Sequence, residues 1–232
     1  MSARPEEIQR RLHGLTEIGD VVGALRAIAS GHAGAARGAL PAIAAYAGTV
    51  AQALAAVAPP AQSVPAGPGL VVVVGASQGF SGAYPQHLAE EARRSAPAGS
   101  GLLVVGQRTL ALLQDGALPI LWSADLPVHP GEIPALASRL TDALLDLAPR
   151  HPGPIALVAA RDLPGQPAQA HRLWPPEAPA NAPTPPRALL CTLPPAALIE
   201  GLQAEALFAA VTAALMEGLR AENQARVEAM SR

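Results

Sequence analysis

The sequence contains no lysine and few aromatic residues. All 16 of its cationic residues are arginine, and the formal net charge is −2 over 232 residues. A near-neutral chain has no electrostatic footprint for nucleic acid, so we expect no nucleic-acid partner. Phe, Trp and Tyr make up only 3% of a chain that is 50% hydrophobic, so the apolar content is mostly Ala, Leu and Val. Small aliphatic side chains favour closely packed helices over aromatic-lined pockets.

Cysteine is almost absent too. Cys191 has no second cysteine with which to form an internal disulfide, and the histidines share no metal-ligand spacing. We therefore expect no metal and no cofactor. The N-terminus has no signal-peptide pattern, and the longest uncharged helical stretch, Ala42 to Ala58, stops at Pro59. It is shorter than the about 20 residues that a spanning helix needs, so we also expect no membrane span.

The segment from Pro5 to Ala58 is predicted to be a long helix with a partner. Its apolar period is seven, which is typical of a coiled coil. Many glycines weaken this helix, and Pro41 is expected to kink or divide it. The positions of the seven-residue stripe are Ile8, Leu15, Val22, Ala29, Ala36, Ile43, Val50 and Val57.

The middle of the chain has the pattern of a small α/β domain. Four apolar runs predict buried strands, and helical stretches lie between them, which favours a mostly parallel sheet. The predicted strands are Leu70–Val74, Leu102–Val105, Pro119–Trp122 and Ile155–Ala160, and the predicted helices are His87–Ser95, Thr109–Gln114 and Ile133–Leu147. Prolines are frequent in the stretch from Pro152 to Pro195, so much of it is expected to be loop, with an edge strand at Arg187 to Leu193.

The last segment, Pro195 to Arg232, is predicted to be a helix with the same seven-residue period. The simplest architecture is therefore an antiparallel coiled coil of the N- and C-terminal helices, with the α/β domain inserted between them. This interpretation divides the chain into a helix (1–58), a Pro/Gly linker (59–69), an α/β domain (70–194) and a second helix (195–232).

Three segments resemble one family in the right order. Ile8-Gln-Arg-Arg-Leu12 followed by Ala24-Leu25-Arg26-Ala27-Ile28-Ala29 is similar to the first helix of the gamma subunit of the rotary, proton-translocating ATP synthase. Gly79-Phe-Ser-Gly-Ala-Tyr84 resembles the family's Gly-Leu-Cys-Gly-Gly-Tyr/Phe. Ala221-Glu-Asn-Gln-Ala-Arg-Val-Glu-Ala-Met230 resembles its Ser-Glu-His-x-x-Arg-Met-x-Ala-Met. The likeness covers nearly the whole chain.

The resemblance implies a non-catalytic rotor subunit of the central stalk, with a Rossmann-like α/β domain at its foot. Such a subunit couples proton-driven rotation to ATP synthesis or hydrolysis in the catalytic ring. Its implied partners are the alpha and beta subunits of that ring, the epsilon subunit and the membrane rotor ring. The implied location is the cytoplasmic face of a bacterial inner membrane, as a peripheral protein.

The resemblance also implies which residues form subunit contacts. Leu25 and Arg26, with Glu222 and Arg226, are expected to face the catalytic ring or to lock the two helices together. The other implied interface residues are Gly79, Gly82, Tyr84 and Met230.

Several positions depart from the family pattern. The family's lysines are replaced by Thr16, Gly23 and His32, its Asp-Arg by Ser77 and Gln78, and an Asn by Pro85. The family's last helix runs on beyond the position of Met230, so a C-terminally shortened subunit with weaker torque transmission is a further expectation.

Two other functions compete with the rotor. A degenerate scaffold could keep the fold without driving rotation. Alternatively, Gly75-Ala-Ser77-Gln-Gly79 matches the nucleophile elbow of serine hydrolases, with Asp146 or Asp162 and His171 completing a triad. Since only a coiled helix precedes this turn, the hydrolase is the weaker hypothesis. The same turn matches neither dinucleotide nor P-loop spacing, which argues against a nucleotide site.

Overall fold

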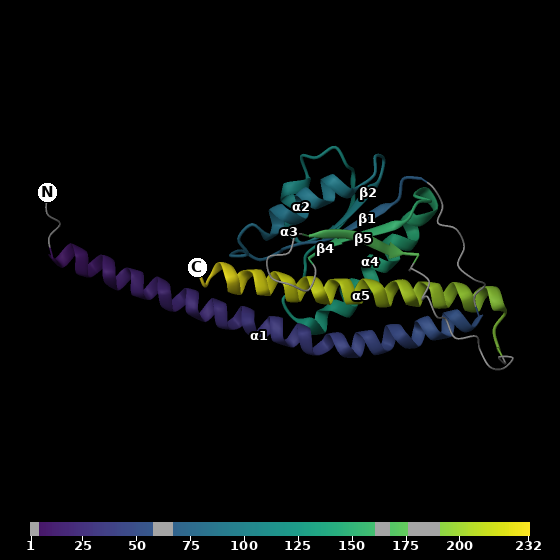
Figure 1. The fold of residues 1–232 in the computed structure, drawn as a ribbon, viewed down its shortest axis with the longest axis horizontal. Helices are drawn as coiled ribbons and strands as arrows, with labels where there is room; N and C mark the ends of the chain where they lie inside the picture. Colours follow the sequence, from purple (N-terminus) through teal and green to yellow (C-terminus); the bar gives the residue numbers. More distant parts are fainter. Residues whose placement is uncertain (1–4, 58–66, 161–167, 176–190) are drawn as a thin grey trace.

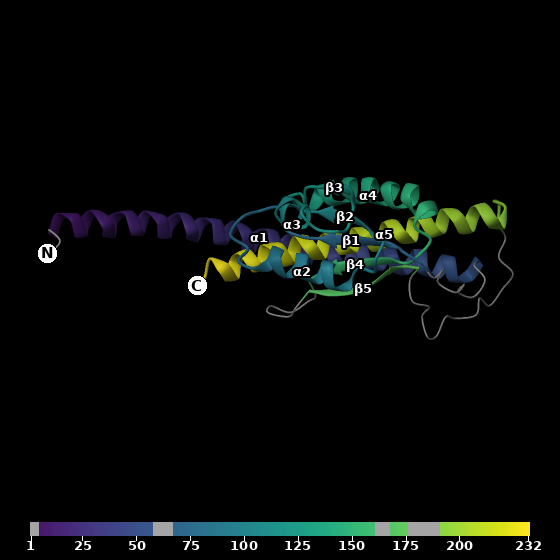
Figure 2. The same ribbon diagram turned by 90° about the horizontal axis from the view of Figure 1, so that it is seen from above.

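Two long helices from the two ends of the chain lie side by side with opposite directions (Figures 1 and 2). The structure is a computed structural model, and it describes residues 5–57, 67–160, 168–175 and 191–232. Helix α1 is Pro5–Val57 and helix α5 is Pro195–Ala229. A sheet domain formed by the chain between them packs along α5. The predicted antiparallel pair with an inserted α/β domain is confirmed, and we call α1 and α5 together the shaft.

The predicted seven-residue stripe is buried along only part of α1. Ala29, Ala36 and Val50 are buried, and Val22 and Ile43 are half-buried. Leu15 belongs to the same stripe but is 65% exposed, because α1 projects past the end of α5 (Figure 1). The seven-residue period therefore predicted correctly which face of α1 is buried, but not over what part of its length α1 packs against a partner.

Helix α1 continues through Pro41 as one helix, although it bends in its middle part (Figure 1). Proline removes one backbone donor and leaves the carbonyl four residues earlier without its usual partner. That carbonyl belongs to Arg37, and both residues are exposed. Water can therefore replace the missing hydrogen bond. Of the two expected outcomes, the helix is bent and is not divided in two.

The sheet has five strands in the order β3-β2-β1-β4-β5. The first four are mutually parallel where they pair, and β5 is antiparallel to β4. Their bounds are β1 Leu70–Val74, β2 Gly101–Val105, β3 Ile120–Ala124, β4 Ile155–Ala159 and β5 Gln169–Trp174.

Helices cover both faces of this sheet (Figure 1). Alternate β1 side chains point to opposite faces: Val71 and Val73 pack with α2 and α3, whereas Leu70, Val72 and Val74 pack with α4 and α5. The bounds of the remaining helices are α2 Tyr84–Ser95, α3 Gln107–Leu113, η1 Pro130–Glu132, α4 Ile133–Leu147 and η2 Ala148–Arg150. Helix α5 therefore belongs to the shaft and to the core of the sheet domain at once.

The four predicted strands are confirmed within two residues at each end, but β5 was not predicted. Its sequence, Gln169–Trp174, is polar and lies within the proline-rich stretch that was expected to be mostly loop. The edge strand predicted at Arg187 to Leu193 falls largely on residues outside the described part of the chain.

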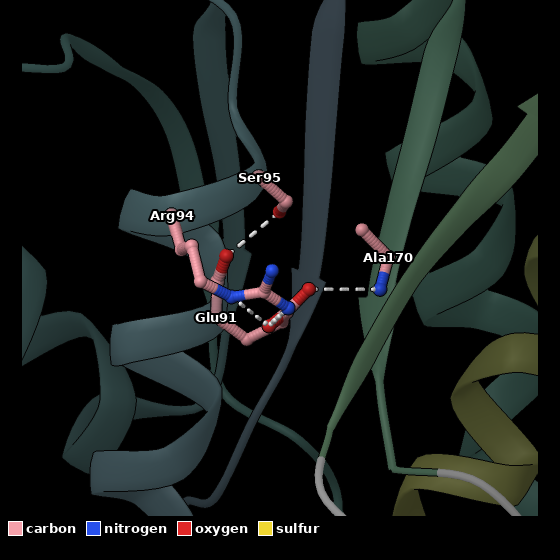
Figure 3. A network of polar contacts seen from close by, with 4 residues as sticks. All are labelled: Glu91, Arg94, Ser95 and Ala170. Carbon is pink, nitrogen blue, oxygen red and sulfur yellow. Dashed lines mark hydrogen bonds and ion pairs between the residues drawn. The ribbon is translucent and has the colours of Figure 1, made fainter.

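The edge strand β5 is fixed to α2 by a buried carboxylate (Figure 3). Glu91 accepts a hydrogen bond from the backbone N–H of Ala170 at 3.2 Å and is paired with Arg94. The hydroxyl of Ser95 donates to the backbone carbonyl of Glu91 at 2.7 Å. An unpaired edge N–H invites pairing with another chain, and Glu91 occupies this one.

Two glycines on the outer face of α1 give a first testable prediction. Gly34 and Gly38 are exposed, and a Cβ on either would have nothing within 4 Å. The double variant Gly34→Ala/Gly38→Ala should raise the free energy of unfolding in urea by about 1–2 kcal/mol, because alanine in a helix loses less backbone entropy than glycine. The reverse change at exposed Ala35, Ala35→Gly, should lower it by about 1 kcal/mol. Unchanged stability in both would show that this part of α1 does not unfold with the rest.

Candidate functional site

The loop that follows β1, residues 75–83, lies where the sheet domain meets α5. It starts close to α3, because a Cβ on Gly75 would lie 2.1 Å from Oγ1 of Thr109. The backbone N–H of Ala76 donates to the same Thr109 oxygen at 3.0 Å. Glycine at position 75 is thus required for the chain to turn away from β1 beside α3.

A buried carboxylate from α5 reaches the backbone of this loop. The N–H groups of Ser77 and Gln78 both donate to Oε1 of Glu222, at 2.9 and 2.5 Å. Glu222 is 1% exposed, so this contact is closed to solvent. On the other side of the loop, the Ser77 hydroxyl accepts a hydrogen bond from the N–H of Leu126 at 2.8 Å. The loop is therefore held from α5 and from the segment after β3.

The electrostatics of the junction are dominated by desolvation. Burial raises the pKa of Glu222 from its usual value to about 7, although the hydrogen bonds from Gln78 and Ser77 and the positive charge of Arg226 act in the opposite direction. Burial, and then the charge of Glu222, raise the pKa of Tyr84. The Tyr84 hydroxyl has no hydrogen-bond partner among the described residues. Glu222 consequently changes its charge near neutral pH.

The structure brings several of the implied interface residues to this junction. Gly82 has φ +57°, and a Cβ there would lie 3.7 Å from Cβ of Ala229 near the end of α5. Arg226 is buried and directs Nη1 to Oδ1 of Asn223 at 3.4 Å. Tyr84, Gly82, Glu222 and Arg226 thus lie around the contact of the loop with α5.

The remaining implied residues lie elsewhere. Gly79 lies near the guanidinium of Arg108, which would be 3.3 Å from an added Cβ. Leu25 is half-buried and Arg26 is exposed, both upstream of Ala29 on α1, and Met230 is half-buried just after α5. Their roles as subunit contacts stay predictions.

Two residues of the junction, Phe80 and Asn223, were not among the implied interface residues. Phe80 is 63% exposed and has φ +61°, a left-handed backbone conformation that is rare for a bulky residue. Asn223 is 3% exposed and donates to the carbonyl of Leu219 at 2.9 Å. The interruption of the apolar period of α5 at Asn223 was the available signal, and it marks the turn of helix next to Glu222.

A cavity of about 430 Å³ opens beside the loop, at the carboxyl ends of β1, β2 and β3. Its lining is mainly polar, but the part of the chain that the structure describes contains no group of three or more His, Cys, Asp or Glu side chains placed to hold a metal ion. The lining residues are Ser77, Gln78, Gln107, Asp125, Leu126, Pro127, Val128, His129 and Glu132.

The geometry at Ser77 argues against the serine hydrolase. In a nucleophile elbow, the N–H of the residue after the serine helps to form the oxyanion hole. Here that residue is Gln78, whose N–H is taken by the Glu222 carboxylate. Since the side chain of Glu222 already accepts this N–H, the loop cannot use it to stabilise a developing oxyanion. The same two N–H groups, of Ser77 and Gln78, are not available to bind a phosphate. Of the proposed triad partners, Asp162 lies outside the described residues.

Comparison with known proteins places the chain in a family. The ATP synthase family model, that of the gamma subunit, matches residues 4–232. A comparison with curated proteins gives no match. Among solved structures, the chain is similar to one from the central stalk and c-ring of the Tetrahymena thermophila mitochondrial ATP synthase. The TM-score is 0.63 at 16% identity, over 91% of this chain and 98% of that one.

The chain therefore belongs to the gamma-subunit family of the ATP synthase. Its members are non-catalytic stalk subunits of the rotary complex, so the expected family and rotor-stalk role are confirmed.

Proposed function

We propose that this chain is the shaft-bearing rotor subunit that couples proton-driven rotation to ATP synthesis or hydrolysis in a catalytic ring of alpha and beta subunits. The observation that carries the proposal is the joining of one sheet domain to a two-helix shaft through α5, which contributes buried residues to the core of that domain. A torque applied to the sheet domain is passed to the shaft without an intervening flexible linker at this junction. Its other partners are an epsilon subunit and the membrane rotor ring, against which the sheet domain rests.

The projecting part of α1 is suited to enter the ring. Four large apolar side chains on it are exposed, in contrast to the buried stripe further along the helix. They are Leu12, Leu15, Ile18 and Val21, with exposed fractions of 58%, 65%, 62% and 60%. Four large apolar side chains that are exposed so close together indicate a binding surface for a protein partner. Leu25 and Arg26 follow directly, at the place where α1 begins to pack on α5.

Assembly with catalytic subunits tests this proposal. The variant Leu12→Ser/Leu15→Ser should bind a reconstituted ring of alpha and beta subunits at least about 10-fold more weakly, because burying two leucines contributes several kcal/mol. The matched control is Leu145→Ser, which changes a 44% exposed leucine on α4 of the sheet domain. Affinity of the ring should be measured by titration, and ATP-driven rotation by single-molecule imaging. Equal affinity of both variants would contradict the proposed insertion. If the unmodified chain binds the ring but shows no ATP-driven rotation, the degenerate scaffold would be favoured.

The protein is proposed to lie on the membrane complex without crossing the bilayer, at the cytoplasmic face of a bacterial inner membrane. By length and composition alone, two helices could span a membrane: Gln9–Val57, with mean hydropathy 1.5, and Pro195–Ala229, with mean hydropathy 1.4. The second buries Glu222, Asn223 and Arg226 against the rest of the chain. Packing on the sheet domain accounts for its apolar character, as in the core helix of many proteins without a membrane span.

A further inference from the structure

The sheet domain is attached to the shaft mainly through α5, which lies between α1 and the sheet (Figure 1). Buried residues of α5, including Leu215 and Leu219, pack into the core of the domain. These contacts lie close to the axis of α5, so each has a short lever arm against a twist of the domain about that helix. The axes of packed helices are about 8–10 Å apart. A contact between the domain and α1 therefore resists the same twist with a longer lever arm.

Such a contact exists between α1 and the segment after β3. The ring of His32 on α1 lies edge to face with the ring of His129, the residue before η1. The ring centroids are 5.4 Å apart and the interplanar angle is 80°. The Nδ1 atom of His32 is buried and has no hydrogen-bond partner among the described residues. The two elements therefore meet here through an edge and a face, an arrangement that aromatic pairs favour.

The backbone that carries each ring is anchored on both sides. On α1, buried Ala29 and Ala36 stand before and after His32. In the sheet domain, buried Leu126 and Ile133 stand before and after the second ring. Neither ring can follow the other without a shift of its whole element. Relative motion of α1 and the domain must therefore separate the two rings.

We propose that His32 and His129 are positioning residues that brace the sheet domain against α1 and limit its twist about the shaft. The domain is then attached at two places, at α5 by its core and at α1 by the two rings, so that domain and shaft turn as one body. The role of the brace in torque transmission rests on the proposed rotor function, whereas the brace itself does not.

Amide exchange on the whole chain tests the brace. The N–H of Glu132 donates to the carbonyl of His129 at 3.1 Å, so its exchange reports opening of this segment. In His32→Ala this exchange should become about 2- to 10-fold faster, the range expected for losing one aromatic pair. His32→Phe keeps a ring that can lie edge to face and should restore slow exchange. The matched control is His87→Ala, at an exposed histidine on α2, and it should change nothing.

Spin labels measure the relative motion of α1 and the domain directly. Ala35 on α1 and Ser138 on α4 are both exposed and accept a label as cysteine variants, in a Cys191→Ser background. The distribution of distances between the two labels should be broader in His32→Ala and unchanged in His32→Phe. Unchanged exchange and an unchanged distribution in His32→Ala would overturn the brace. It would also be overturned if His32→Phe behaved like His32→Ala, because the ring contact would then not be the cause.

The torsional stiffness of the assembled rotor tests the role in torque transmission. With the catalytic ring immobilised and a bead attached to the sheet domain, angular fluctuations should be wider for His32→Ala than for His32→Phe or His87→Ala. Equal fluctuations in all three would overturn this role, and the brace would remain a contact without mechanical consequence. If the unmodified chain binds no ring, the proposed function fails and the torque role falls with it. The brace is then still decided by exchange and by the label distances.

Discussion

Gly218→Ala is expected to lower the free energy of unfolding by about 2 kcal/mol, although the same substitution at Gly34 should raise it. The difference lies in what surrounds the two glycines. A Cβ on Gly218 would lie 2.2 Å from Cγ1 of Val74, whereas one on Gly34 meets nothing within 4 Å. Val74 is fully buried and β-branched, so it has little freedom to move aside. Urea unfolding of both single variants measures the contrast.

A double-mutant cycle identifies the clash as the cause. Val74→Ala alone removes buried methyl groups and should cost about 1–3 kcal/mol. Combined with Gly218→Ala, Val74→Ala also makes room for the new methyl group. The double variant should therefore lose clearly less stability than the sum of the losses of the two single variants. Additive costs would mean that α5 and β1 are not in close contact at this point. The shaft would then be connected to the sheet domain by other residues.

The parts of the fold that could be predicted from sequence are those with a strong local pattern. The run Leu70–Val74 is apolar on both faces because the strand is covered by helices on both sides, and its bounds were predicted without error. The same reasoning failed for β5, since an edge strand is partly solvated. Gln169 and Arg172 are exposed, and the strand reads as polar loop. The strand is defined by its pairing with β4 and by its hydrogen bond to Glu91, and Glu91 is 79 residues away from Ala170 in the sequence.

Only part of the candidate site could be predicted from the sequence, and the surroundings of its residues could not. Glu222 and Arg226 are four residues apart, which on an isolated helix suggests an exposed ion pair. In the structure both are buried, because α5 packs against α1 and the sheet domain at once, and Arg226 directs Nη1 to Asn223. A helical period describes one face, so it could not show that a second face of α5 is covered. Nor could it show that backbone N–H groups more than a hundred residues away would provide the partners of Glu222.

Glu222→Gln is expected to stabilise the protein at pH 8 by about 3 kcal/mol and to have little effect at pH 4.5. The pKa of Glu222 is about 7 in the folded chain, against 4.5 for the ordinary group. The folded state therefore holds this proton more tightly than the unfolded state does. The stabilisation that comes from this more tightly held proton is complete below pH 4.5, declines between pH 4.5 and 7, and is lost above pH 7.

Glutamine keeps an acceptor for the N–H groups of Ser77 and Gln78 and cannot ionise, so the penalty for burying a charge disappears. The measurement is the difference in the free energy of unfolding between Glu222→Gln and the unmodified chain, from urea titrations between pH 4.5 and 8. Because other carboxyl groups titrate equally in both proteins, their contributions cancel in this difference. Glu228→Gln, on the same helix, is the matched control and should show a flat difference over the range. A flat difference for Glu222→Gln as well would mean that the carboxylate is solvated in the folded protein, and that the contact between the loop and α5 is open to water.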